Sequence, residues 1–228
     1  MTSLKLALDN ALEYLSKRNI DIPHDILVAA ASRLKTAAGY DMIQRVYRDT
    51  MTNALIGYFE GGSIVAARNA FKKAMVEAFG AAFDAAWMEA GGILPPSAEA
   101  LAWFNARVNA ELGYIDLLFQ QAKELRGMED FDYFTWITQR ADGYLQTLRG
   151  IYNNGKARAM KGSLMVTFLG DDGKESCDTC QWLKGQRHRL SWFIGYDYIP
   201  PFGGGLDCAK GGRCKHYLEA DDGYRVTE

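Results

Sequence analysis

Apolar side chains recur every three or four positions through most of residues 1–155, which is the spacing of an amphipathic α-helix. Two short helices are predicted within residues 4–19 and 25–37, the second ending at Gly39. A third is predicted to end at Gly61, and four apolar residues define it: Met42, Val46, Leu55 and Phe59. Each run is apolar on one side only, so these helices are expected to pack against one another.

Three longer helices are predicted to follow. The first has a ridge of large side chains four residues apart: Phe71, Met75, Phe79, Phe83 and Trp87. The second begins after Ser97, a typical N-cap, and has apolar residues close to heptad spacing: Leu101, Phe104, Val108, Leu112, Ile115, Leu118 and Leu125. The third is predicted to end near Asn154 and Gly155, with apolar residues in steps of three and four: Phe134, Ile137, Ala141, Tyr144, Leu148 and Ile151.

These stripes have two interpretations: the core of a helical bundle, or surfaces for partner helices. We favour the core, because a ridge of phenylalanine, methionine and tryptophan usually packs inside a protein. Five residues are therefore predicted to be buried: Phe79, Phe83, Val108, Ile115 and Leu148.

The pattern changes after Gly162. Apolar residues alternate with polar or small ones over residues 163–169, as in a short β-strand, and residues 170–173 have the composition of a turn. All four cysteines lie beyond this turn: Cys177, Cys180, Cys208 and Cys214. A cysteine-rich module is therefore expected after the helices.

A metal site is the favoured interpretation of these cysteines. The C-x2-C spacing of Cys177 and Cys180 lets one tight turn present two thiolates to a tetrahedral zinc ion. Cys208 and Cys214 would complete the site, with His216 as an alternative ligand, and four such ligands leave no open position for water. The zinc would then be structural. Disulfides and reduced or redox-active thiols are the alternatives, and the lack of an evident secretory signal counts against disulfides.

These patterns predict a mainly α protein with two parts. Residues 1–155 are expected to form a long-helix bundle. Residues 156–228 are expected to form a small α+β, zinc-ribbon-like C-terminal module, stabilised by the metal.

The formal net charge is −2, from 26 lysines and arginines against 28 aspartates and glutamates. That balance excludes a protein whose whole surface neutralises phosphate, although residues 156–216 carry 10 basic and 6 acidic side chains. Six cations beside the cysteines make a candidate partner-binding face: Lys184, Arg187, Arg189, Lys210, Arg213 and Lys215. This face would contact nucleic acid or an acidic protein, or would simply be solvated. No apolar stretch is long enough to span a membrane, so no membrane partner is expected.

Candidate catalytic residues are scarce. The chain has 3 histidines and contains neither G-x-S-x-G nor H-E-x-x-H, so we expect no enzymatic activity. The aromatic residues between the two cysteine pairs are expected to form a small core over the metal, or else a stacking surface for single-stranded nucleic acid. We favour the core for this set: Trp182, Trp192, Phe193, Tyr196, Tyr198 and Phe202.

The order of motifs near the C-terminus has a counterpart in a known family. A helix ending N-N-G-K-A-R is followed by the strand M-V-T-F, the turn D-D-G-K, the motif C-D-T-C-Q-W-L-K-G, a Pro-Pro pair and R-C-K-H. This order resembles the C-terminal region of the Mu F-like minor head proteins of tailed bacteriophages. Four residues match that family's C-x2-C-x2-L-x-G motif: Cys177, Cys180, Leu183 and Gly185. Asp142 stands where the family usually has a glutamate, and no His-Pro pair precedes the last cysteines.

The resemblance covers residues 130–218 and implies a structural protein of the virion, assembled in the bacterial cytoplasm. It implies a minor head protein at the portal or inner capsid, without catalytic activity, in an oligomeric state set by the symmetry of the virion. Portal or capsid proteins would be its partners, and packaged DNA a further contact. The alternative from the residues alone is a zinc-stabilised nucleic-acid-binding module, and a redox or hydrolytic enzyme is the third class considered.

Overall fold

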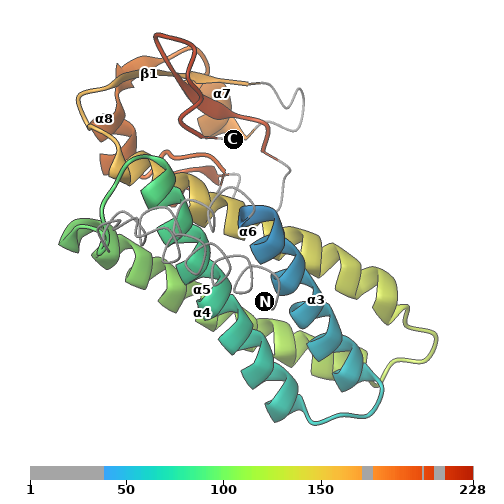
Figure 1. Ribbon diagram of the computed structural model, residues 1–228. Helices are drawn as coiled ribbons and strands as arrows, with labels where there is room; N and C mark the ends of the chain where they lie inside the picture. Colours follow the sequence, from blue (N-terminus) through green and yellow to red (C-terminus); the bar gives the residue numbers. More distant parts are fainter. Residues whose placement is uncertain (1–38, 171–176, 202, 208–213, 228) are drawn as a thin grey trace, which may run out of the picture.

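The computed structural model describes residues 39–170, 177–201, 203–207 and 214–227. Figure 1 shows the long helices side by side, with a small β-sheet and the short helices at one end of them. The long helices are α3 (Gly39–Phe59), α4 (Ile64–Glu89), α5 (Ala98–Leu125) and α6 (Tyr133–Ala159). The protein is therefore mainly helical, and the two helices predicted within residues 4–37 lie outside the described residues.

Helix α4 is the centre of the bundle and packs chiefly against α6 and α3. Its ridge of large side chains is buried as predicted, with Phe71, Met75 and Phe79 fully inaccessible and Phe83 at 1 % exposure. Alanines fill the neighbouring positions of α4, which lets the surrounding helices approach closely. The other residues predicted for the core are also buried: Val108, Ile115 and Leu148.

The ends of the long helices follow ordinary capping chemistry. The Ser97 hydroxyl accepts a hydrogen bond from the amide of Ala100, which confirms the predicted N-cap of α5. The side chains of Ser63 and Asp132 cap α4 and α6 in the same way. Among the described residues, no helix combines the length and the apolar content that crossing a membrane requires.

Two of the predicted stripes are placed differently in the structure. Met42 and Val46 of α3 are 50 % and 60 % exposed, because the buried face of that helix is built on Tyr47 and Met51 together with Leu55, which was predicted correctly. The prediction took the aliphatic residues for the core, whereas the Tyr47 ring packs edge-on against Phe79 at 5.9 Å. Phe134 of α6 was also wrongly placed in the core and is 55 % exposed.

Helix α6 continues one turn beyond its predicted end. The sequence Asn-Asn-Gly at residues 153–155 has the composition of a helix terminus, yet α6 runs to Ala159 and residues 150–157 are all buried. Gly155 is required there because a side chain would collide with α4: a Cβ atom would lie 2.7 Å from the Phe83 carbonyl oxygen. The residues that resemble a terminus in fact include the position where α6 packs tightly against α4.

The C-terminal part is built on a three-stranded antiparallel sheet in the order β2-β1-β3. Its strands are β1 (Met165–Leu169), β2 (Arg187–Arg189) and β3 (Tyr217–Ala220), and β1 lies within the predicted strand. Alternate residues of β1 point inward, so Val166 and Phe168 are fully buried. They pack in a second core with residues of the short helices α7 (Asp178–Leu183) and α8 (Leu190–Gly195).

The end of α6 joins the two cores through buried polar contacts. The Asn153 side-chain amide donates to the Pro200 carbonyl at 2.8 Å, and Arg158 pairs with Asp197 at 3.6 Å. Lys156, only 3 % exposed, pairs with Glu89 of α4 at 3.1 Å. Burial alone would lower the pKa of Lys156, but hydrogen bonding and attraction to Glu89 raise that pKa above its ordinary value. Lys156 therefore stays charged and links the bundle to the last turn of the chain, where it lies 5.1 Å from the centre of the Tyr224 ring.

Candidate metal centre

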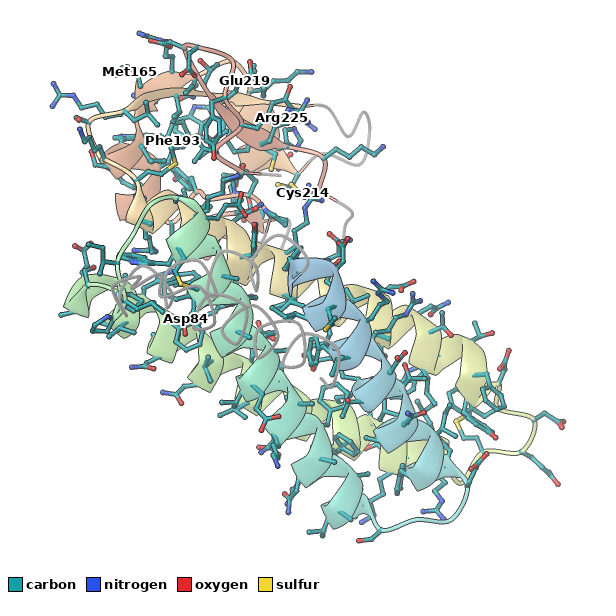
Figure 2. The ribbon with its side chains drawn as sticks, in the orientation of Figure 1. Asp84, Met165, Phe193, Cys214, Glu219 and Arg225 are labelled. Carbon is teal, nitrogen blue, oxygen red and sulfur yellow. The ribbon has the colours of Figure 1, made fainter. Side chains whose placement is uncertain are left out.

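Three side chains from two separate segments meet beside the sheet: Cys180, Cys214 and His216. Cys180 is the third residue of α7. Cys214 and His216 lie just before β3. Their ligand atoms all fall within 4.8 Å of one another, and all three side chains are buried. This group can hold a metal ion. In the view of Figure 2, Cys214 lies between the sheet and the long helices.

The group is packed against the second core on the His216 side. The His216 ring stacks on Phe168 of β1, with ring centres 5.3 Å apart and an angle of 29° between the planes. Gly170, which follows β1, has a positive φ of 109°, and a Cβ there would lie 2.5 Å from the Lys215 carbonyl oxygen. Glycine is therefore needed where the chain leaving β1 passes the segment that carries Cys214 and His216.

The distance from the Cys214 Sγ to the His216 Nδ1 is 3.8 Å. Zinc bonds of about 2.3 Å to sulfur and about 2.0 Å to nitrogen, at a tetrahedral angle, set such a pair about 3.5 Å apart. The two ligand atoms are thus close to the separation that a shared zinc ion requires. The donor set of sulfur and imidazole is also the one that zinc prefers.

Cys177 is the N-cap of α7 and is not a member of this group. Its Sγ accepts a hydrogen bond from the Cys180 amide at 3.4 Å, which ties the C-x2-C turn together. Cys208, the remaining predicted ligand, lies outside the described residues. The neighbouring Asp207 accepts a hydrogen bond from the Thr179 hydroxyl, so the chain reaches α7 one residue before Cys208.

The candidate partner-binding cations do not share one environment. Arg187 is paired with the Asp221 carboxylate, which raises the pKa of the arginine and lowers that of the acid through their hydrogen bonds. Lys184 and Arg189 are exposed near α7 and α8, and Lys215 is exposed between two members of the metal group. Lys210 and Arg213 lie outside the described residues.

The aromatic residues between the cysteine pairs divide into two sets. Phe193 is fully buried in the second core, 6.3 Å from Phe168, as the interpretation of a small core predicts. Trp182 and Tyr196 are instead 57 % and 58 % exposed, so the same interpretation is wrong for them. Phe202 lies outside the described residues.

Several buried charged residues were missed by the sequence analysis. Glu111 of α5 is 4 % exposed and pairs with Arg107 at 2.7 Å, while burial raises its pKa. The only signal of this pair in the sequence is the four-residue spacing on one helix face. Asp197 accepts a hydrogen bond from the Trp103 indole at 3.1 Å as well as pairing with Arg158. That cluster joins residues almost a hundred positions apart, which no local pattern reveals.

Comparison with protein-family models, with curated proteins and with solved structures gave no match to this chain. What the protein does must therefore be argued from its own residues.

Proposed function

We propose that this protein is a structural, non-enzymatic component of a tailed-bacteriophage head whose C-terminal module is closed by a zinc ion. The observation that carries the proposal is the buried group of Cys180, Cys214 and His216. Cys180 belongs to the C-x2-C-x2-L-x-G motif on which the resemblance to Mu F-like minor head proteins rests. The motif and the metal group therefore support each other.

Zinc is the ion that best fits this group. Two thiolates and one imidazole are soft to intermediate ligands, which calcium and magnesium do not select. A fourth ligand from Cys177 or Cys208 would close the coordination sphere and leave no position for a reactive water. The ion would then hold α7 and the segment before β3 together. It would not catalyse a reaction.

Metal analysis of the purified full chain tests the zinc. We expect about one zinc per chain in protein prepared without chelator, and loss of that zinc in the variants Cys180→Ser and His216→Ala. Lys215→Ala is the matched control, since Lys215 is exposed between two ligands, and it should keep the metal. Loss of zinc in either Cys177→Ser or Cys208→Ser identifies the fourth ligand. Less than about 0.2 zinc per chain, with disulfides found by mass spectrometry, overturns the metal assignment.

A role in the phage head is supported by the length of the helices and by an exposed apolar contact on α5. Helices α4, α5 and α6 have 26, 28 and 27 residues, so each is about 40 Å long. Tyr114 and Leu117, three residues apart on α5, are 57 % and 61 % exposed and give this helix an outward apolar contact. Repeated around a ring of partner subunits, such weak contacts add through multivalency.

Quantitative mass spectrometry of purified virions tests the placement in the head. We expect the protein in the particle at a low copy number, comparable with that of the portal and far below that of the major capsid protein. The variant Tyr114→Ser/Leu117→Ser should fold normally, since both side chains are exposed, and should be incorporated less. Absence of the unmodified protein from virions, or a copy number equal to that of the capsid lattice, contradicts this role.

A further inference from the structure

Four aromatic side chains form a continuous surface on α7, α8 and the turn after α8: Trp182, Trp192, Tyr196 and Tyr198. We call this set the aromatic surface. The Trp192 ring is its centre, 5.0 Å from Tyr196, 5.5 Å from Tyr198 and 6.5 Å from Trp182. The two tyrosine rings are stacked at 5.7 Å with only 12° between their planes. Its two ends, Trp182 and Tyr196, are more than half exposed.

The aromatic surface is held in place by polar contacts that the metal group does not use. The Gln186 side-chain amide donates to the Trp182 carbonyl at 2.8 Å, and its oxygen lies 3.1 Å from the His188 Nε2. The His188 ring in turn stacks on Trp192 at 4.0 Å. These contacts hold the Trp182 backbone and the central Trp192 ring in place before any partner arrives, which reduces the cost of ordering the surface on binding.

Exposed cations border this surface. Arg189 is the last residue of β2 and the N-cap residue of α8, and it is exposed at the start of the helix that carries Trp192. Lys184 is exposed two residues after Trp182, and Lys161 is exposed next to Gly162, whose carbonyl accepts from the Ser191 amide of α8. Two acidic side chains also lie near this surface: Asp197, which stands between Tyr196 and Tyr198 in the sequence and is paired with Arg158, and Asp178, one turn before Trp182 on α7.

We infer that the aromatic surface is a binding site for single-stranded nucleic acid, with unpaired bases stacking on Trp182 and Tyr196 and phosphates meeting Lys184 and Arg189. This activity goes beyond the structural role proposed above and does not depend on it. Flat, exposed rings beside cations match the two parts of a nucleotide, an apolar base and a charged phosphate. A duplex keeps its bases stacked inside, so it offers these rings no face to bind.

Nucleic acid fits these residues better than a peptide does. A proline-rich peptide would use the grooves between aromatic rings but has no regular charge for the flanking cations. A nucleotide strand carries a phosphate at every residue, and each base can stack on any ring without a particular sequence. The site should therefore bind with little sequence preference and with an affinity that falls as salt increases.

Fluorescence anisotropy with the full chain and a labelled oligothymidine of about 12 nucleotides tests the inference. Trp182→Ala and Tyr196→Ala should each weaken binding about 10-fold, and the double variant by more, since stacking contributes about 1–3 kcal/mol per base. Phe134→Ala is the matched control, because Phe134 is 55 % exposed, a similar fraction, but lies on α6. It should leave the affinity unchanged.

The charges give a second, independent measurement. Lys184→Ala/Arg189→Ala should reduce the slope of log affinity against log salt by about 1.4, because each phosphate contact on a single strand contributes about 0.7, whereas Asp178→Asn should tighten binding. An oligouridine of the same length shows whether RNA or DNA is preferred, and the corresponding duplex should bind weakly. No binding at low salt, equal binding of the duplex, or binding unaffected by the two ring variants overturns the inference. Capture of a peptide by the same rings, without oligonucleotide binding, also overturns it.

Discussion

Replacing Gly155 by valine is expected to prevent the chain from folding. Gly155 lies where α6 crosses α4, and a Cβ atom there would come within 2.7 Å of the Phe83 carbonyl oxygen and 3.2 Å of the Ala86 Cβ. The backbone of α4 cannot yield, because Phe83 is itself packed between Phe104 and Trp103, with ring centres at 4.9 and 6.1 Å. We expect Gly155→Ala to cost about 3 kcal/mol and Gly155→Val more than about 4 kcal/mol.

Urea unfolding followed by circular dichroism measures this effect. Gly143→Ala is the matched control, since Gly143 lies in the same helix and a Cβ there would meet nothing within 4 Å. That variant should be as stable as the unmodified protein or more stable by about 0.5–1 kcal/mol, because alanine favours the helix. If Gly155→Val folds with unchanged stability, the close packing of α4 and α6 is wrong.

Removing the proposed zinc ion is expected to unfold the C-terminal module and to leave most of the bundle folded. The strands β1, β2 and β3 have only 5, 3 and 4 residues, so the sheet depends on the core beside it and on the clamp between Cys180 and the Cys214–His216 segment. The first core, built on α3, α4, α5 and α6, contains none of these ligands. It should therefore survive chelation.

Hydrogen exchange with and without a chelator measures the extent of unfolding. We expect loss of protection in residues 164–169, 178–195 and 217–220, and retained protection in α4 and α5. The last turns of α6 should lose part of their protection, because Asn153 and Arg158 bond to Pro200 and Asp197. Chelator should cause no further change in Cys180→Ser, which already lacks a ligand. Loss of most helical circular dichroism on chelation would instead show that the two cores unfold as one unit.

The long helices could be predicted from the sequence because their signals are local. The four-residue ridge from Phe71 to Trp87 and the N-cap at Ser97 depend only on neighbours within one or two turns, and the structure confirms both. The alternation over residues 163–169 identified β1 for the same reason. In α3 the predicted stripe was correct at Leu55 but wrong at Met42 and Val46, since spacing does not tell whether Val46 or Tyr47 faces the core.

Local pattern also identified which residues can bind a metal, but only the fold selected among them. The C-x2-C spacing and the late cysteines predicted a metal site, with His216 as an alternative ligand. The fold then brought Cys180, Cys214 and His216 together across 36 positions of sequence and left Cys177 as the cap of α7. Which residues bind one metal ion depends on how segments far apart in the sequence pack together. The spacing of residues within one segment does not give the distance between two segments.

The sequence by itself thus determined the helical period, the first strand and the chemistry of the C-terminal residues, because each follows from the covalent order of close neighbours. Only tertiary packing gave residues 153–157 their role, since they have the composition of a helix end and form a buried helix turn. It also decided that Trp182 and Tyr196 face solvent while Phe193 is buried. Burial depends on which other segments cover a side chain, and that is fixed only when the whole chain has packed.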